Sequence, residues 1–108
     1  MPDALPPPPD IPEGLEHMLP QFVAEMGKDA ATLSALAQAP LDQLADHAHA
    51  MRGKAAMFGE AVLYGLLTRI EEKAMAGDGG GVVALINQVI ERSGQLALYE
   101  RTTALDAS

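Results

Sequence analysis

The chain has 108 residues, and 48% of them are hydrophobic, which is enough for one domain with a single modest core. Its formal net charge of -8 would repel nucleic acids and anionic membrane surfaces, and only 4% of its residues are aromatic and able to stack on bases. Without cysteine it forms neither a disulfide nor a thiolate metal site, and no apolar stretch is long enough to cross a membrane, so we expect a cytoplasmic protein.

Prolines dominate the N-terminal segment. Residues 1–12 include a run of prolines at positions 6–9, and proline has no backbone N–H and favours extended polyproline geometry. We therefore expect a Pro-rich tail over residues 1–12, disordered or extended, that precedes the folded domain. A ligand for an aromatic groove on another protein has a similar composition and is the alternative interpretation.

From residue 13 onwards the apolar residues recur at steps of three and four, and no segment keeps the strict alternation of a half-buried strand. This period predicts a first helical region over residues 15–39. Pro20 and Gly27 would bend or divide it, because proline removes an intrahelical hydrogen bond and glycine costs roughly 1 kcal/mol relative to alanine.

The second and third helices have clear ends in the sequence. The second is predicted to begin near Pro40, because proline suits the first helical turn and Asp42 complements the positive end of the helix dipole. Gly59 is its predicted terminator. The third covers residues 60–76 and stops at the Gly-Asp-Gly-Gly-Gly turn that follows it. Its predicted buried stripe consists of Leu63, Leu66, Leu67, Ile70 and Ala74.

The fourth helix is predicted over residues 82–99, and we expect residues 102–108 to form a frayed C-terminal tail. Its predicted buried residues are Val82, Val83, Ile86, Val89, Ile90 and Ala97. Four amphipathic helices joined by short loops predict an all-α fold, an antiparallel up-down four-helix bundle over residues 13–101. No internal repeat indicates a solenoid.

Two histidines, His47 and His49, fall on the second helix. The apolar positions that define the inward face of this helix are Leu41, Leu44, Ala48, Met51, Ala55 and Phe58. At about 100° per residue, His49 lies just beside this face and His47 points elsewhere. Metal ligands on one helix are usually three or four residues apart, whereas a spacing of two separates these rings by about 200°. We expect no metal site, and His17 is too isolated to complete one.

The neighbours of His49 favour a docking surface. Asp46 lies three residues before it and Arg52 three residues after it, so both can reach the imidazole or a group attached to it. Gly53 is unfavourable in mid-helix by roughly 1 kcal/mol, and one reason for a glycine there is the close approach of another protein. The other small residues predicted on this surface are Ala45 and Ala56.

An exposed imidazole such as that expected for His49 can act as a nucleophile. It is substantially neutral at cytoplasmic pH, so one ring nitrogen can attack phosphorus. Arg52 would then offset the charge of a phosphoryl group through charge-assisted hydrogen bonds. These residues alone are not specific, because a histidine near an arginine and a glycine is most often part of an ordinary solvated helix face.

A longer pattern around this histidine resembles a family signature. It comprises His49-Ala50-Met51-Arg52-Gly53, Ala55, Ala56, Phe58-Gly59 and Leu63, and in the next helix Ile70-Glu71, Ala74 and Gly77-Asp78. The hydrophobic positions that match in the first long helix are Phe22, Leu33 and Leu36. Over about residues 22–78 the chain resembles the histidine phosphotransfer (HPt) domain.

The resemblance implies that His49 is phosphorylated, that Arg52 takes the place of the family's phosphate-supporting lysine, and that Gly53 makes room for a response regulator. Two residues depart from the pattern. Met51 replaces the usual leucine, which is a volume-conserving change. Lys54 stands where a small residue is common, and it either adds positive charge near the phosphate, shapes the choice of partner or is a plain solvated lysine.

By this resemblance the protein is a phosphoryl carrier of a two-component phosphorelay, and it has no Gly-rich nucleotide loop that would make it a kinase. It would accept a phosphoryl group from a receiver-domain aspartate or a histidine kinase and pass it to a response regulator. We expect Mg²⁺ on the receiver and no cofactor in this chain.

We also expect a monomer, and the initiating Met1 and two loose tails favour a free-standing protein. The main alternative is a non-phosphorylated HPt-like module that docks a kinase or receiver domain. A structural dimerisation domain is a third class.

Overall fold

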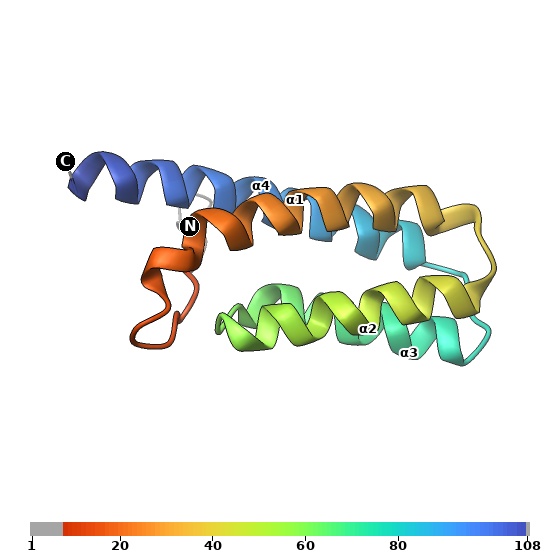
Figure 1. Cartoon of the computed structure of the whole chain (residues 1–108). Helices are drawn as coiled ribbons and strands as arrows, with labels where there is room; N and C mark the ends of the chain where they lie inside the picture. The colour runs from red at the N-terminus through yellow and green to blue at the C-terminus, as the bar shows by residue number, and fades with distance from the viewer. Residues whose placement is uncertain (1–7, 108) are drawn as a thin grey trace, which may run out of the picture.

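The computed structural model describes the backbone of residues 8–107 and the side chains of residues 8–103. Its elements in chain order are η1 (Glu16–Met18), α1 (Leu19–Ala35), η2 (Leu36–Gln38), α2 (Leu41–Met57), α3 (Ala61–Met75) and α4 (Val82–Ala107), where η denotes a 3₁₀ helix. No strand occurs within residues 8–107, so the predicted all-helical fold with four main helices is confirmed. Figure 1 shows α1 beside α4 in one layer and α2 beside α3 in the other, with the chain reversing direction at each connection.

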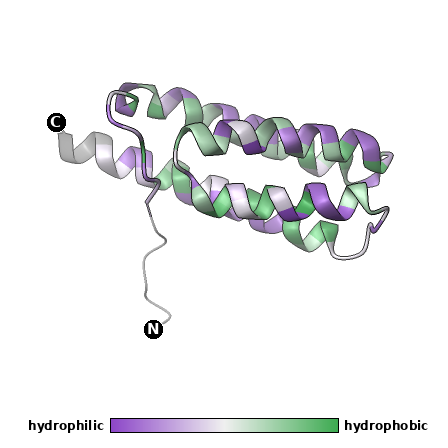
Figure 2. Ribbon diagram, turned by 90° about the horizontal axis from the view of Figure 1, so that it is seen from below, coloured by the Kyte–Doolittle hydropathy of each residue, from purple (hydrophilic) through white to green (hydrophobic). Residues whose placement is uncertain are grey.

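The buried faces of the four helices meet in one hydrophobic core. The apolar stripes predicted for α2 and α3 belong to it, because every third or fourth residue on each helix turns toward the other layer. The largest fully buried apolar side chains are Met26, Leu33, Leu44, Met51, Leu63, Leu67, Ile70, Ile86, Leu96 and Val89. Figure 2 shows the resulting alternation of hydrophobic and hydrophilic residues along the ribbons.

Two residues of α4 that the sequence predicted to be buried are exposed instead. The exposed fraction is 51% for Val83 and 42% for Ile90. The core side of α4 is formed by Val82, Leu85, Ile86, Val89 and Leu96, and the two exposed residues lie along one edge of this side, next to Ile86 in the helical period. The apolar face of α4 is therefore wider than the surface that the bundle covers.

Proline and glycine set the helix ends. Pro20 lies in the first turn of α1, so it begins the helix and does not divide it, and Gly27 lies inside an unbroken helix. Gly59 and Gly77 have positive φ angles of 65° and 73° and follow the ends of α2 and α3, as predicted.

The fourth helix is longer than predicted. It continues to Ala107, past the expected end near residue 99 and through most of the stretch 102–108 that was expected to fray. The physical reason is that residues 100–107 contain neither glycine nor proline, so nothing local stops the helix. Ser108 lies outside the described residues.

Part of the predicted N-terminal tail is packed onto the bundle. The backbone N–H of Asp10 donates to the carbonyl oxygen of Gly59 at 3.0 Å, and Ile11 packs against the core. Gly59 is required there, because a Cβ atom would lie 1.8 Å from the Asp10 carbonyl oxygen. Residues 8–12 of the predicted Pro-rich tail form neither helix nor strand and lie against the bundle, and residues 1–7 lie outside the described part of the chain.

A buried ion pair that the sequence did not reveal joins α3 to α4. Glu60 is 1% exposed and Arg92 is 3% exposed, and the guanidinium donates to one carboxylate oxygen of Glu60. The other carboxylate oxygen accepts the backbone N–H of Leu63 at 2.7 Å and so caps α3. Because a buried charge is costly unless it is paired, this contact favours one register of α3 against α4.

Candidate functional site

His49 projects from the outer flank of α2. Its side chain is 63% exposed, whereas its neighbours Ala48 and Met51 are fully buried. The helical period explains the difference, because Ala48 and Met51 share the inward stripe and His49 falls beside it. The exposure that the sequence predicted for this ring is confirmed.

The contact that defines the site comes from the neighbouring helix. The Nδ1 atom of His49 lies 2.9 Å from the Oε2 atom of Glu71 on α3, and the Glu71 side chain is only 15% exposed. Glu71 follows the buried Ile70, so α3 presents it at the edge of its contact with α2. In the sequence Glu71 is recognisable only as part of the family pattern, and its local spacing does not place it beside His49.

Arg52 completes a group of three. Its Nη2 atom lies 3.2 Å from Nδ1 of His49, and its Nη1 atom lies 3.3 Å from Oε1 of Glu71. The guanidinium carbon also lies 5.8 Å from the centre of the Tyr64 ring, within the range of a cation–π contact. The predicted proximity of Arg52 to His49 is confirmed, while Glu71 and Tyr64 are partners that the sequence did not indicate.

The contacts at Nδ1 favour one arrangement of the imidazole proton. A carboxylate only accepts hydrogen bonds, so a neutral His49 ring bonded to Glu71 carries its proton on Nδ1. The longer approach of Arg52 cannot then be a hydrogen bond to the same nitrogen, and the guanidinium acts on the ring and on Glu71 through its charge. The free lone pair of His49 is consequently on Nε2.

One side of His49 borders a hollow of about 500 Å³ between α2 and α3. The other residues that line it are Asp42, Ala45, Asp46, Glu71, Ala74 and Met75. Asp46, which was predicted to reach the imidazole, is exposed and lines the hollow with His49, but the carboxylate at Nδ1 of His49 belongs to Glu71. Ala45 was predicted on the docking surface and is only 8% exposed, because it packs into the core contact between α2 and α3 and lines the base of the hollow.

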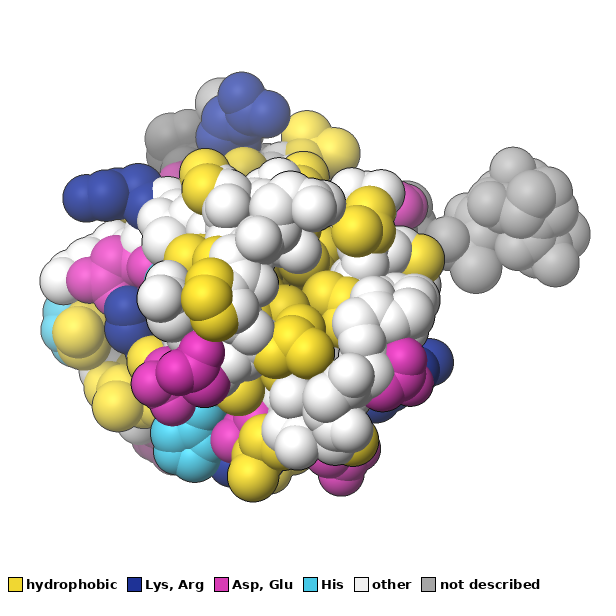
Figure 3. All heavy atoms as spheres, turned by 90° about the vertical axis from the view of Figure 1, so that its right-hand side faces the viewer, with side chains coloured by type: hydrophobic (Ala, Val, Ile, Leu, Met, Phe, Trp, Pro, Cys, Tyr) yellow, Lys and Arg dark blue, Asp and Glu magenta, His cyan; other side chains and the backbone are white. Residues whose placement is uncertain are grey.

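Acidic side chains dominate the charge of this region. Figure 3 views the end of the bundle where α1 meets α2 and α3 meets α4, and histidine and acidic side chains lie next to each other on its surface. Asp42 in the first turn of α2 and Asp46 one turn later place two carboxylates along the hollow beside His49. Any partner that covers the hollow therefore meets negative charge there.

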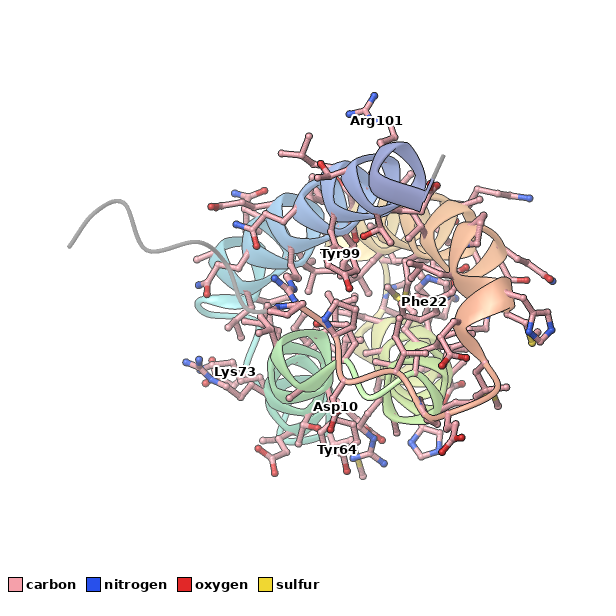
Figure 4. The ribbon with its side chains drawn as sticks, turned by 90° about the vertical axis from the view of Figure 1, so that its left-hand side faces the viewer. Asp10, Phe22, Tyr64, Lys73, Tyr99 and Arg101 are labelled. Atoms are coloured by element: carbon pink, nitrogen blue, oxygen red, sulfur yellow. The ribbon has the colours of Figure 1, made fainter. Side chains whose placement is uncertain are left out.

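The other side of His49 has small residues and open space. Gly53 is exposed, and a Cβ atom added to it would find nothing within 4 Å. Ala56 is also exposed and lines a second hollow, of about 340 Å³, with Asp10 and Tyr64. The predicted surface without bulky groups therefore exists at Gly53 and Ala56, and its far edge is formed by Tyr64 and the N-terminal segment (Figure 4).

Lys54 does not belong to this surface. Its Nζ atom lies 2.9 Å from Oδ2 of Asp29 on α1, and this hydrogen bond, followed by the charge of Asp29, raises the pKa of the Lys54 amine. Lys54 was predicted among the residues that contact a partner, and in the structure its side chain faces α1 and is held by Asp29. It is about 140° around α2 from His49.

His47 also binds α1. Its Nε2 atom lies 2.9 Å from the backbone carbonyl oxygen of Asp29, which can only accept, so Nε2 carries the proton. His47 and His49 therefore face different helices, as the spacing predicted. Among the described residues, no cluster of three or more His, Cys, Asp or Glu side chains is placed to hold a metal ion.

Comparison with known proteins gives one match. The family model described as Hpt domain matches residues 17–102. The chain belongs to the Hpt domain family. As an Hpt domain it is a phosphotransfer module of two-component signalling, a class of phosphoryl carriers that work with receiver domains and histidine kinases. Neither the search of the curated proteins nor the search of the solved structures found a match.

The matched region contains α1, α2 and α3 and the part of α4 up to residue 102, and it includes His49, Arg52 and Glu71. Within the described residues, none of the helices combines the length and the apolar character needed to span a membrane.

Proposed function

We propose that His49 is the phosphoryl acceptor of this Hpt domain in a cytoplasmic phosphorelay. It takes the group from the aspartyl phosphate of a receiver domain, or from a histidine kinase, and passes it to a response regulator. The observation that carries the proposal is the contact between Nδ1 of His49 and Glu71, which leaves the lone pair of a 63% exposed ring on Nε2.

The chemical step is an in-line displacement at phosphorus. The Nε2 lone pair of His49 forms the N–P bond while the bond between phosphorus and the partner's carboxylate oxygen breaks, which regenerates the aspartate. The ring becomes an imidazolium, and its Nδ1 proton is shared with the Glu71 carboxylate at 2.9 Å. Transfer to the next regulator is the same step reversed on a different carboxylate.

Glu71 and Arg52 act on this step in different ways. Glu71 orients the ring and stabilises the positive charge that develops when Nε2 attacks, in the way that a carboxylate supports an imidazole general base. Arg52 keeps a positive charge beside the ring, which offsets the charge of the incoming phosphoryl group. Its contact with Tyr64 holds the guanidinium over the exposed side of α3.

The partner supplies the remaining parts. A receiver domain would lie against the surface formed by Gly53, Ala56 and Tyr64, with Asp46 at the opposite edge of the contact. We place Mg²⁺ on the receiver, where it neutralises the phosphoryl oxygens. This chain contributes the nucleophile and its support.

The test incubates the purified chain with a receiver domain labelled on its aspartate with radioactive phosphate. We expect acid-labile label on the wild-type chain and on a His47→Gln variant, and none on a His49→Gln variant. Label retained by His49→Gln would overturn the assignment. If wild type takes no label but binds the receiver, the chain is a docking module and the proposal fails.

A further inference from the structure

A second surface lies on the layer opposite His49. The residues that line this groove, about 510 Å³ between α1 and α4, are Val23, Gly27, Ala30, Ala31, Ser34, Ile90, Ser93, Gly94 and Ala97. None of them is charged, although 20% of the chain is. Figure 4 shows the two layers apart, with Tyr64 on the side of α2 and α3 and Arg101 projecting from α4 on the opposite side.

One polar group in this groove lacks a partner. The Ser93 side chain is 8% exposed, and its buried hydroxyl has no hydrogen-bond partner in the described structure. Buried polar groups in folded proteins are almost always paired, so this hydroxyl has an unused hydrogen-bonding capacity at the lining of the groove.

Two mid-helix glycines of the groove are not needed by the fold itself. Gly27 on α1 and Gly94 on α4 have no positive φ, and a Cβ atom on either would find nothing within 4 Å. Each glycine costs its helix roughly 1 kcal/mol relative to alanine. The lost stability is consistent with the close approach of a helix from outside, which a Cβ atom on either residue would hinder.

The face of α4 along this groove is self-complementary. Ile90 is 42% exposed and stands one turn before Gly94 on the same side of the helix. When two copies of α4 cross antiparallel about a two-fold axis, Ile90 of each copy lies over Gly94 of the other.

We propose that the groove between α1 and α4 binds a second copy of this chain, through an antiparallel contact of the two α4 helices. A face without acidic residues is where two chains of charge -8 meet with least repulsion. The contact leaves His49 free in both copies, so the inference stands independently of the phosphoryl acceptor. It replaces the expectation of a monomer.

Cross-linking tests the register of this contact, because the chain has no cysteine of its own. An equimolar mixture of Asn87→Cys and Ala97→Cys chains, which keeps Ile90 and Gly94 and joins two positions that the same register brings together, should give the mixed disulfide under mild oxidation about tenfold faster than Asn87→Cys mixed with Val62→Cys, whose cysteine is on α3. Equal rates for the two mixtures would overturn the proposed register.

Sedimentation velocity tests the association itself. The wild-type chain should dimerise as its concentration rises, and more strongly at high salt, because salt screens the repulsion between two acidic chains. An Ile90→Asp variant should remain monomeric, with an unchanged helical circular dichroism spectrum and undiminished labelling of His49. A wild-type chain that stays monomeric throughout, or an Ile90→Asp variant that loses only its binding to a kinase or receiver, would refute the self-association.

Discussion

The carboxylate of Glu71 on α3 lies 2.9 Å from Nδ1 of His49 on α2, and this contact between two helices fixes which ring nitrogen is free. Residues 22 positions apart in the chain meet because α2 and α3 pack side by side. The Glu71 side chain is only 15% exposed, whereas the His49 side chain is 63% exposed, so the carboxylate is shielded from water more than the imidazole.

Replacing Glu71 by glutamine should slow phosphoryl transfer to His49 without unfolding the protein. An amide no longer stabilises the developing imidazolium, and the loss of one charged hydrogen bond corresponds to a rate that is lower by about 10- to 100-fold. A rapid-quench time course with a labelled receiver measures it. Glu72→Gln, an exposed neighbour on α3, is the matched control and should transfer at the wild-type rate. Equal rates for both variants would remove Glu71 from the mechanism.

Replacing Gly53 in α2 and Gly59 after the end of α2 by alanine should change the free energy of unfolding in opposite directions. Gly53→Ala should stabilise the fold by up to about 1 kcal/mol, because Gly53 is helical and nothing lies near its missing Cβ atom. Gly59→Ala should destabilise it, because Gly59 has a φ of 65° and the Asp10 carbonyl oxygen occupies the space of a Cβ atom. Urea unfolding of both variants gives the two free energies.

A bulky side chain at position 53 tests whether Gly53 lies in the surface that contacts a receiver domain. Gly53→Leu should keep the helix and weaken the binding of a receiver domain by about tenfold or more, since a large side chain would stand on the predicted contact surface. Isothermal titration calorimetry with the receiver measures the affinity. A Gly53→Leu chain that binds as tightly as wild type would show that the receiver lies elsewhere.

Lys54 should matter for stability at neutral pH and not for phosphoryl transfer. Its hydrogen bond with Asp29 raises the pKa of the amine above the ordinary value of 10.5, so the folded state holds this proton more tightly than the unfolded chain. The stabilisation is complete below pH 10.5 and is lost as the pH rises through the raised pKa. Because Lys54 is 43% exposed, we expect no more than about 1 kcal/mol.

The measurement compares the free energy of unfolding of wild type and Lys54→Met between pH 7 and about pH 11. Their difference should be constant up to about pH 10 and then shrink. Lys28→Met, an exposed lysine of α1, should show no such dependence. A difference that grows with pH would contradict the role given to Asp29.

Removing only one charge of the buried ion pair between Glu60 and Arg92 should lower the free energy of unfolding strongly. Arg92→Met leaves the Glu60 carboxylate unpaired in the core and should lower the free energy of unfolding by about 3–5 kcal/mol. The double variant Glu60→Gln, Arg92→Met should recover part of this loss, because no charge is then buried. Chemical denaturation of the single and double variants checks it, and a loss below about 1 kcal/mol in Arg92→Met would show that the pair is unimportant.

The sequence predicted the helices well where hydrophobic period and glycine ends agree. The buried stripe of α3 and the turn after it follow from local spacing, and so does the position of His49 outside the stripe of α2. These features depend on residues close together in the chain. The exception is α4, which lacks a local stop signal after residue 99 and continues to Ala107.

What the sequence could not predict depends on contacts between distant residues. The place of Glu71 at Nδ1 of His49 depends on how α2 and α3 are packed, and the burial of Ala45 depends on the same contact. The docking of residues 8–12 on Gly59 likewise joins segments far apart. Lys54 is different, because its helical angle from His49 already separates the two, and the charge of Asp29 then determines where it points.

The central claim is that phosphorus becomes bonded to Nε2 of His49, and nuclear magnetic resonance tests it most directly. A ¹⁵N-labelled chain phosphorylated by its receiver should show one new phosphoramidate signal, with phosphorus–nitrogen coupling to Nε2 of His49 and with Nδ1 still protonated. Coupling to Nδ1 of His49, or to a nitrogen of His47 or His17, would contradict the account.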